Sequence, residues 1–205
     1  PVPPSEFEVS VGNMNETILV LDFGGQYKEL IASTVRSLNV YSEIRPGNLL
    51  AEEIKKLNPV GIILTGGPNS VHLSDSPKCD PGLFGLGIPI LGICYGMQMM
   101  CQLLGGEVAP GGNTLKSAGE YGSVPVTVTA RSKLLNETNG TFNALMSHRD
   151  IVTSLPKDFI KTASTLNCIA ACESASKKLY GVQFHPETKH TAGGKEIIKR
   201  FLYDV

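Results

Sequence analysis

The five residues Gly92-Ile93-Cys94-Tyr95-Gly96 have the pattern of a nucleophile elbow, with cysteine where hydrolases often carry serine. Such a nucleophile stands on a sharp turn between a strand and a helix, and small residues on both sides let the two elements approach. The positive end of the following helix would favour the thiolate form of Cys94. The pattern therefore favours a nucleophile over the alternative, a buried structural cysteine in a glycine-rich turn.

A second chemical pattern is the His-x-Glu pair in Gln183-Phe184-His185-Pro186-Glu187. If the preceding strand continues, residues two apart point to the same side, so the Glu187 carboxylate can hold the His185 imidazole. A histidine held in this way can act as the acid and base that a cysteine nucleophile needs. Such pairs are common by chance and more often lie in solvent, so the interpretation depends on the elbow at Cys94.

The third pattern, Thr65-Gly66-Gly67-Pro68-Asn69, follows a predicted strand, where ligands of open α/β sheets bind. Glycines there leave backbone N–H groups free to face a developing oxyanion. A tight turn without catalytic function is an equal alternative. The absence of a GKT or GKS ending argues against a phosphate-binding loop.

The elements that would position these residues alternate regularly in the first half of the chain. Short apolar runs predict buried strands, and Tyr27, Leu30, Ile31, Val35 and Leu38 recur at helical spacing on one face. The predicted strands cover 17–22, 40–45, 60–65 and 88–93, and further helices cover 49–58 and 97–106. This alternation indicates a parallel sheet covered by helices.

The second half of the chain changes character. Short runs rich in β-branched residues predict partly antiparallel strands over 123–129, 142–148, 159–164 and 167–173, then a strand over 178–182 and a last helix over 193–203. The predicted fold class is α/β, with a mostly parallel central sheet, helices on both faces and additional antiparallel strands in the C-terminal half. We expect one domain over residues 14–205, preceded by an N-terminal tail or cloning remnant over residues 1–13.

Composition narrows the function classes. The chain has 205 residues and a formal net charge of −1, which argues against nucleic acid or an anionic membrane as its main partner. Its five cysteines form no CxxC pair and have no zinc-finger spacing, so we expect no metal site and free thiols in a reducing cytoplasm. No run of apolar residues is long enough to span a bilayer.

Five segments in order resemble landmarks of the class I (triad) glutamine amidotransferases, most closely those of the amidotransferase domains of GMP synthases. They are LDFGGQY, ILTGGPNSV, GICYGMQ, MSH at 146–148, and YGVQFHPE followed by HT. The resemblance runs from about Ile18 to the C-terminus and implies a flavodoxin-like fold. Carried over by position, it implies Cys94 as nucleophile, His185 as acid and base, and Glu187 as the group that orients the histidine.

The same resemblance implies how the substrate, glutamine, would be held. Backbone N–H groups of Gly67 and Tyr95 would form the oxyanion hole, and the substrate-binding residues would be Gln98, Ser147 and His148. The chain departs from the family pattern at Arg149, where Gly is common, and at Thr188, where Val is usual. It also has Ser33 and Thr34 where relatives often carry arginines.

The resemblance also implies a partner. We expect no cofactor in this domain, because ATP and Mg²⁺ would serve a GMP synthetase (ATP pyrophosphatase) domain, fused or separate, that converts XMP to GMP. No SGGxDS-like ATP loop is present in the sequence. The chain is therefore either an excised domain or a separately encoded subunit, and its close match to the motifs of fused enzymes favours an excised domain.

Three alternatives stay open. The chain could serve anthranilate, carbamoyl phosphate or CTP synthesis, it could be a peptidase or hydrolase with a Cys elbow, or it could be a silent regulatory module. The joint presence of Cys94, His185 and Glu187 argues against a silent module. A structural or partner-facing role is expected for His72 and His190. Cys79, Cys101, Cys168 and Cys172 are expected to be small buried residues.

Overall fold

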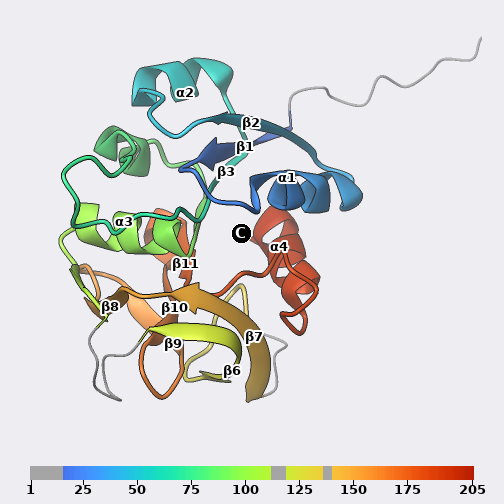
Figure 1. Cartoon of the computed structure of the whole chain (residues 1–205). Helices are drawn as coiled ribbons and strands as arrows, with labels where there is room; N and C mark the ends of the chain where they lie inside the picture. Colours follow the sequence, from blue (N-terminus) through green and yellow to red (C-terminus); the bar gives the residue numbers. More distant parts are fainter. Residues whose placement is uncertain (1–15, 112–118, 136–139) are drawn as a thin grey trace, which may run out of the picture.

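The computed structural model of the chain describes residues 16–111, 119–135 and 140–205 (Figure 1). The tail predicted over residues 1–13 lies outside the described residues. Among the described helices, none is long and apolar enough to cross a membrane.

The first half of the chain alternates between strands and helices, as its apolar runs predicted. Its elements are β1 (Thr17–Asp22), α1 (Lys28–Ser37), β2 (Tyr41–Pro46), α2 (Ala51–Leu57), β3 (Gly61–Leu64), a 3-10 helix (Pro81–Gly85), β4 (Ile90–Ile93) and α3 (Tyr95–Leu103). Helix α3 begins directly after Cys94, two residues before the range predicted for it. Gly105, just beyond its end, has φ +93°, which suits the predicted glycine C-cap.

The second half is mainly strands. They are β5 (Glu107–Ala109), β6 (Glu120–Val128), β7 (Thr141–His148), β8 (Ile151–Ser154), β9 (Ile160–Ser164), β10 (Ile169–Ser174) and β11 (Leu179–Val182), followed by α4 (Gly194–Tyr203); a 3-10 turn (Ala175–Lys177) precedes β11. Strands β5 and β8 were not predicted, because three or four residues carry too little pattern; they pair with each other as a separate ribbon.

Among the described residues the main sheet has the order β2-β1-β3-β4-β11-β10-β9-β6-β7. The first five strands in this order are parallel and the pairs beyond β11 are antiparallel, which confirms the predicted fold class. The parallel part has the flavodoxin-like order 2-1-3-4-5, with β11 as its fifth strand. The last strand of the chain therefore lies beside β4, which leads to Cys94.

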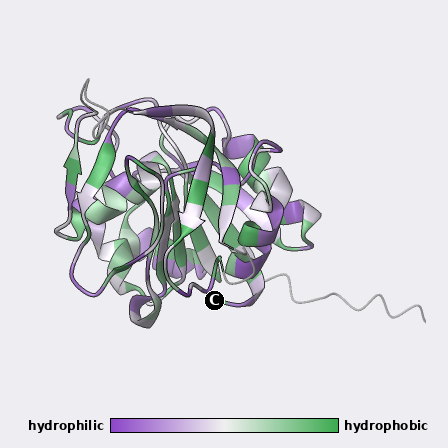
Figure 2. Ribbon diagram, turned by 90° about the horizontal axis from the view of Figure 1, so that it is seen from below, coloured by the Kyte–Doolittle hydropathy of each residue, from purple (hydrophilic) through white to green (hydrophobic). Residues whose placement is uncertain are grey.

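Two hydrophobic clusters lie on the two faces of the parallel strands. Ile18 and Val20 of β1 pack with residues of α1 and α4, whereas Leu19 and Leu21 pack with residues of α2 and α3. Figure 1 shows this division of the helices, and Figure 2 shows hydrophobic colouring concentrated on the central strands. The prediction for α1 was wrong at Leu30, which is 39% exposed, because the buried face of this helix is Ile31, Ala32 and Val35.

Candidate active site

A cleft of about 570 Å³ lies at the carboxyl ends of the parallel strands. Its walls include the turns that follow β1, β3, β4 and β11, represented by Gly25, Gly67, Cys94 and His185. This edge is where open parallel α/β sheets bind their ligands, because the turns after neighbouring strands meet there. The three patterns found in the sequence thus line one cleft.

Cys94 stands on a strained turn between β4 and α3. Its backbone angles are φ 53° and ψ −107°, a conformation that non-glycine residues rarely adopt. A Cβ atom at position 96 would lie 2.4 Å from the Leu64 carbonyl oxygen, and one at position 92 would lie 2.7 Å from the Met97 nitrogen. The glycines on both sides are therefore required for the close approach, as the elbow pattern predicted.

The parallel pairing of β4 with β11 brings His185 to Cys94. Ile93 is in register with Val182, and the Cys94 N–H donates to the Val182 carbonyl oxygen over 2.8 Å. The chain then continues from Val182 to His185, which lines the same cleft as Cys94 and packs edge-on against Tyr27 with 5.1 Å between ring centroids. Two residues far apart along the chain thus meet because their strands are neighbours.

His185 and Glu187 are hydrogen-bonded, with 2.8 Å between Nδ1 and Oε1. The predicted route to this contact was wrong, since β11 ends at Val182 and the two residues lie in a turn. Thr188 and Thr191 both donate through Oγ1 to the His185 carbonyl oxygen, at 3.1 and 2.7 Å. A hydroxyl-braced turn, rather than continued strand geometry, orients this pair.

Electrostatics favour a protonated His185. Burial of the ring alone would lower its pKa, but the hydrogen bonds to Cys94 and Glu187, together with their charges, raise the pKa to about 10. The Glu187 side chain is completely buried beside it. A protonated imidazole in the same cleft as a cysteine can stabilise the thiolate that a cysteine nucleophile uses.

The backbone N–H groups of Gly67 and Tyr95 are unoccupied donors at the cleft. Within the described part of the chain, neither donates a hydrogen bond, and both residues line the cleft together with Cys94. Tyr95 is the first residue of α3, where N–H groups have no partner inside the helix. Two free donors beside Cys94 can bind an oxyanion.

Gln98 lies in the cleft wall, but its amide nitrogen is already engaged. Its Nε2 donates to the Asp150 carbonyl oxygen at 2.8 Å and to Gln183 Oε1 at 3.0 Å. Gln183 Nε2 in turn donates to Cys94 Sγ at 3.6 Å. Gln183 and Asp150 were not predicted as site residues; the signal that could have indicated them was their position near His185 and the MSH segment in the sequence.

The two other predicted substrate-binding residues differ in orientation. Ser147 is exposed, and its carbonyl oxygen lies 3.8 Å from Cys94 Sγ. The His148 ring is buried and bonded at both nitrogens, to the Asp150 carbonyl oxygen and to Glu120. The imidazole of His148 is thus already satisfied inside the protein, and its main chain is the part available to a ligand.

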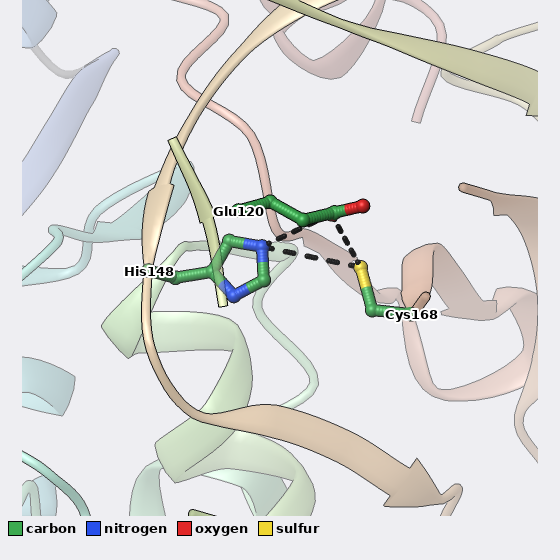
Figure 3. Close-up of side chains that lie close together, drawn as sticks. All are labelled: Glu120, His148 and Cys168. Atoms are coloured by element: carbon green, nitrogen blue, oxygen red, sulfur yellow. Dashed lines mark hydrogen bonds and ion pairs between the residues drawn. The ribbon is translucent and has the colours of Figure 1, made fainter. Parts of the chain in front are cut away.

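One group of side chains has the composition of a metal site. Glu120, His148 and Cys168 converge in the interior, with ligand atoms within 4.8 Å of one another (Figure 3). The expectation that Cys168 is only a small buried residue was therefore incomplete, since its thiol contacts Glu120 Oε2 at 3.2 Å. Burial raises the pKa of Cys168 to about 12, so the thiol keeps its proton and can donate to the carboxylate.

Comparison with known proteins gives consistent matches. A model of the family "Glutamine amidotransferase class-I" matches residues 19–205. The protein "GMP synthase [glutamine-hydrolyzing]" of Caldanaerobacter subterraneus is 50% identical over 196 residues, 95% of this chain and 37% of that protein. Its namesake from Acetivibrio thermocellus is 51% identical over 192 residues, 93% of this chain and 37% of that protein. The chain thus spans about 37% of the length of these relatives.

Solved structures share the fold. A protein from Thermoplasma acidophilum, described as a proposed GMP synthase subunit, superposes with a TM-score of 0.80 and 28% identity, covering 91% of this chain and 92% of that one. A glutamine amidotransferase from Thermotoga maritima gives a TM-score of 0.66 with 23% identity, covering 85% and 77% of the two chains. The second likeness bears on the fold alone.

Proposed function

This chain belongs to the class I glutamine amidotransferase family, and we propose that it is the glutaminase domain of a GMP synthase. It would hydrolyse glutamine to glutamate and ammonia. The observation that carries this proposal is the place of Cys94 and His185 in one cleft, with Glu187 hydrogen-bonded to His185, in a chain half identical to GMP synthases. A silent module would not be expected to keep all three groups in place.

In the proposed reaction the Cys94 thiolate attacks the side-chain amide carbon of glutamine. The oxyanion that forms is held by the N–H groups of Gly67 and Tyr95, a contribution of around 3 kcal/mol for each preorganised donor. Protonated His185 gives its proton to the leaving nitrogen, and ammonia departs from a glutamyl thioester. The now neutral His185 takes a proton from water, which attacks the thioester and releases glutamate.

The cleft suits an amino acid substrate. The Asp150 carboxylate is buried at its wall and accepts a hydrogen bond from the Ser70 hydroxyl. An α-ammonium group placed against a buried carboxylate makes a charge-assisted hydrogen bond, stronger than one between neutral groups. We therefore place the α-amino end of glutamine toward Asp150 and its amide toward Cys94.

The acceptor of ammonia would lie on a partner. This chain covers only 37% of the first GMP synthase relative, so we propose a synthetase domain, fused or separate, that uses ATP and Mg²⁺ to convert XMP to GMP. We propose that the glutaminase step itself uses no cofactor, because Cys94, His185, Glu187 and the backbone N–H groups of Gly67 and Tyr95 supply the groups that the proposed reaction requires. A cytoplasmic location is proposed as well, supported by five cysteines that are all free thiols.

The test uses a glutamine-like diazo-ketone, which alkylates the nucleophile of a competent site even when turnover is slow. We expect modification of Cys94, located by peptide mass mapping and blocked by excess glutamine. Cys94→Ala should lose both labelling and glutamine hydrolysis, whereas Cys101→Ala, on the same helix, should keep both. Full hydrolysis by Cys94→Ala, or no labelling even with the synthetase half added, would refute the proposal.

A further inference from the structure

A continuous chain of hydrogen bonds connects the buried interior of the β6–β7 region to the nucleophile. Glu120 Oε2 contacts His148 Nε2 at 3.3 Å, and His148 Nδ1 contacts the Asp150 carbonyl oxygen at 2.9 Å. The same carbonyl oxygen accepts from Gln98, which donates also to Gln183, and Gln183 donates to Cys94 Sγ. The side chains that take part in this series of hydrogen bonds, those of Glu120, His148, Gln98, Gln183 and Cys94, are all at least nine-tenths buried.

The hydrogen bond to the Asp150 carbonyl oxygen shows that one ring nitrogen of His148, Nδ1, carries a proton. A carbonyl oxygen can only accept, so Nδ1 must carry a proton. Burial disfavours the charged form of Glu120, but hydrogen bonds from His148, Thr165 and Cys168 outweigh it and lower the pKa of this carboxyl. The Glu120 carboxylate lies 3.3 Å from Nε2, so the two buried side chains are in hydrogen-bonding contact, and the contact is an ion pair whenever that nitrogen carries a proton.

Cys168 contacts both Glu120 Oε2, at 3.2 Å, and His148 Nε2, at 4.0 Å, but it makes no bond to the groups between His148 and Cys94 (Figure 3). Its retained proton is needed for the bond to Glu120, whereas a metal ion would require the thiolate. The observed contacts therefore favour a hydrogen-bonded cluster over a metal site. They also make Cys168 a neighbouring control, since removing it leaves the Glu120–His148 contact in place.

We propose that Glu120 is a positioning residue for the glutaminase reaction: through His148 it fixes the Asp150 carbonyl group, and through Gln98 and Gln183 it sets the position of the Cys94 sulfur. This inference rests on the proposed function. Glu120 lies at the start of β6, in the antiparallel part of the sheet, so it connects that part of the fold to the elbow after β4. Because Glu120 itself does not line the cleft, its effect reaches substrate only through other residues.

The experiment compares Glu120→Ala, Glu120→Gln and Cys168→Ala. Glu120→Ala should lower kcat for glutamine hydrolysis by roughly 10- to 100-fold with a much smaller change in KM, because displacing a nucleophile by even 1 Å can cost about 100-fold. In Glu120→Gln the new amide still offers a hydrogen-bonding partner to His148 Nε2, so kcat should recover to within about threefold of the parent. Cys168→Ala should leave kcat within about twofold.

The two ends of His148 can be tested separately. An asparagine amide reaches the position of Nδ1, and a glutamine amide reaches that of Nε2. His148→Asn should therefore keep the donor to the Asp150 carbonyl oxygen and retain about tenfold more kcat than His148→Gln. Equal losses of kcat in His148→Asn and His148→Gln would overturn the proposal that His148 acts through its bond to the Asp150 carbonyl oxygen.

A second readout is independent of glutamine. The rate at which iodoacetamide alkylates Cys94, followed by peptide mass mapping, should fall in Glu120→Ala and stay unchanged in Cys168→Ala. If the parent protein does not hydrolyse glutamine, the proposed function fails while this rate still tests the hydrogen-bond chain. Equal effects of Glu120→Ala and Cys168→Ala would overturn the inference, as would a stoichiometric metal ion in the purified protein that Cys168→Ala removes.

Discussion

His185 Nδ1 lies 2.8 Å from Glu187 Oε1, and the other oxygen of this carboxylate, Oε2, has no hydrogen-bond partner within the described residues. A buried carboxylate normally satisfies both oxygens. Here the charge of Glu187 is directed at a single imidazole. This arrangement raises the proton affinity of His185, and it makes the pair sensitive to loss of that one charge.

Replacing Glu187 with glutamine keeps the size of the side chain and removes its charge. We expect kcat to fall by roughly 100-fold or more, since loss of the orienting carboxylate in a serine protease costs about 10⁴. His185 has a pKa of about 10, so the alkaline limit of kcat/KM should lie near that pH in the parent and at lower pH in Glu187→Gln. The measurement is glutamate release across pH, quantified by chromatography. An unchanged alkaline limit would contradict this assignment.

The same raised pKa has a consequence for stability. The folded protein holds the His185 proton more tightly than the unfolded chain, whose value is near 6.5. The resulting stabilisation is fully present below about pH 6.5 and is lost as pH rises through about 10. Thermal melting should therefore show a decline in Tm from pH 7 to pH 10, and this decline should be smaller in Glu187→Gln. Equal declines in the two proteins would argue against a raised pKa of His185.

The elbow can be tested by adding one methyl group. In Gly96→Ala the new Cβ would lie 2.4 Å from the Leu64 carbonyl oxygen, so strand or helix must move. We expect a loss of about 1–3 kcal/mol in the free energy of unfolding, together with loss of Cys94 labelling. The control is Gly85→Ala, where a Cβ meets nothing within 4 Å. Similar denaturant midpoints for the two variants would disprove the steric requirement.

The threonines that brace the His185 turn are not equivalent. Thr191 Oγ1 donates to the His185 carbonyl oxygen and accepts from the Leu145 N–H at 3.0 Å, whereas Thr188 makes only the first kind of bond. Thr191→Val should cost about 1–3 kcal/mol, because a backbone donor loses its partner, and should also lower kcat. Thr188→Val should cost less than about 1 kcal/mol, since Thr191 still satisfies the carbonyl group. The measurement is chemical denaturation, and a larger loss of unfolding free energy in Thr188→Val than in Thr191→Val would contradict this prediction.

The proposed contact of Asp150 with the α-ammonium group predicts a change in substrate affinity. Asp150→Asn should raise KM for glutamine by about 10- to 100-fold, as expected for the loss of one charge-assisted hydrogen bond, with a smaller change in kcat. Asp158→Asn makes the same chemical change at an exposed position and should leave KM unaltered. Steady-state kinetics of both variants decide the matter, and an unchanged KM in Asp150→Asn would place the α-amino group elsewhere.

Local features of the chain were readable from the sequence alone. The strand before Cys94, the glycines around it and the following helix are properties of neighbouring residues, so apolar runs and turn chemistry were sufficient to predict them. The parallel core and the antiparallel additions followed from the same patterns. Three ordered motifs also indicated the chemistry before any contact between them was known.

Contacts between distant segments required the tertiary structure. The pairing of β4 with β11 joins Cys94 to His185, but nothing in either strand specifies its neighbour, because both are short, fully buried apolar runs. The chain from Glu120 to Cys94 likewise crosses several elements with no sequence period to reveal it. The sequence by itself determined which groups could react, and packing of the strands decided which of them meet, since hydrogen bonds between side chains depend on position in space rather than along the chain.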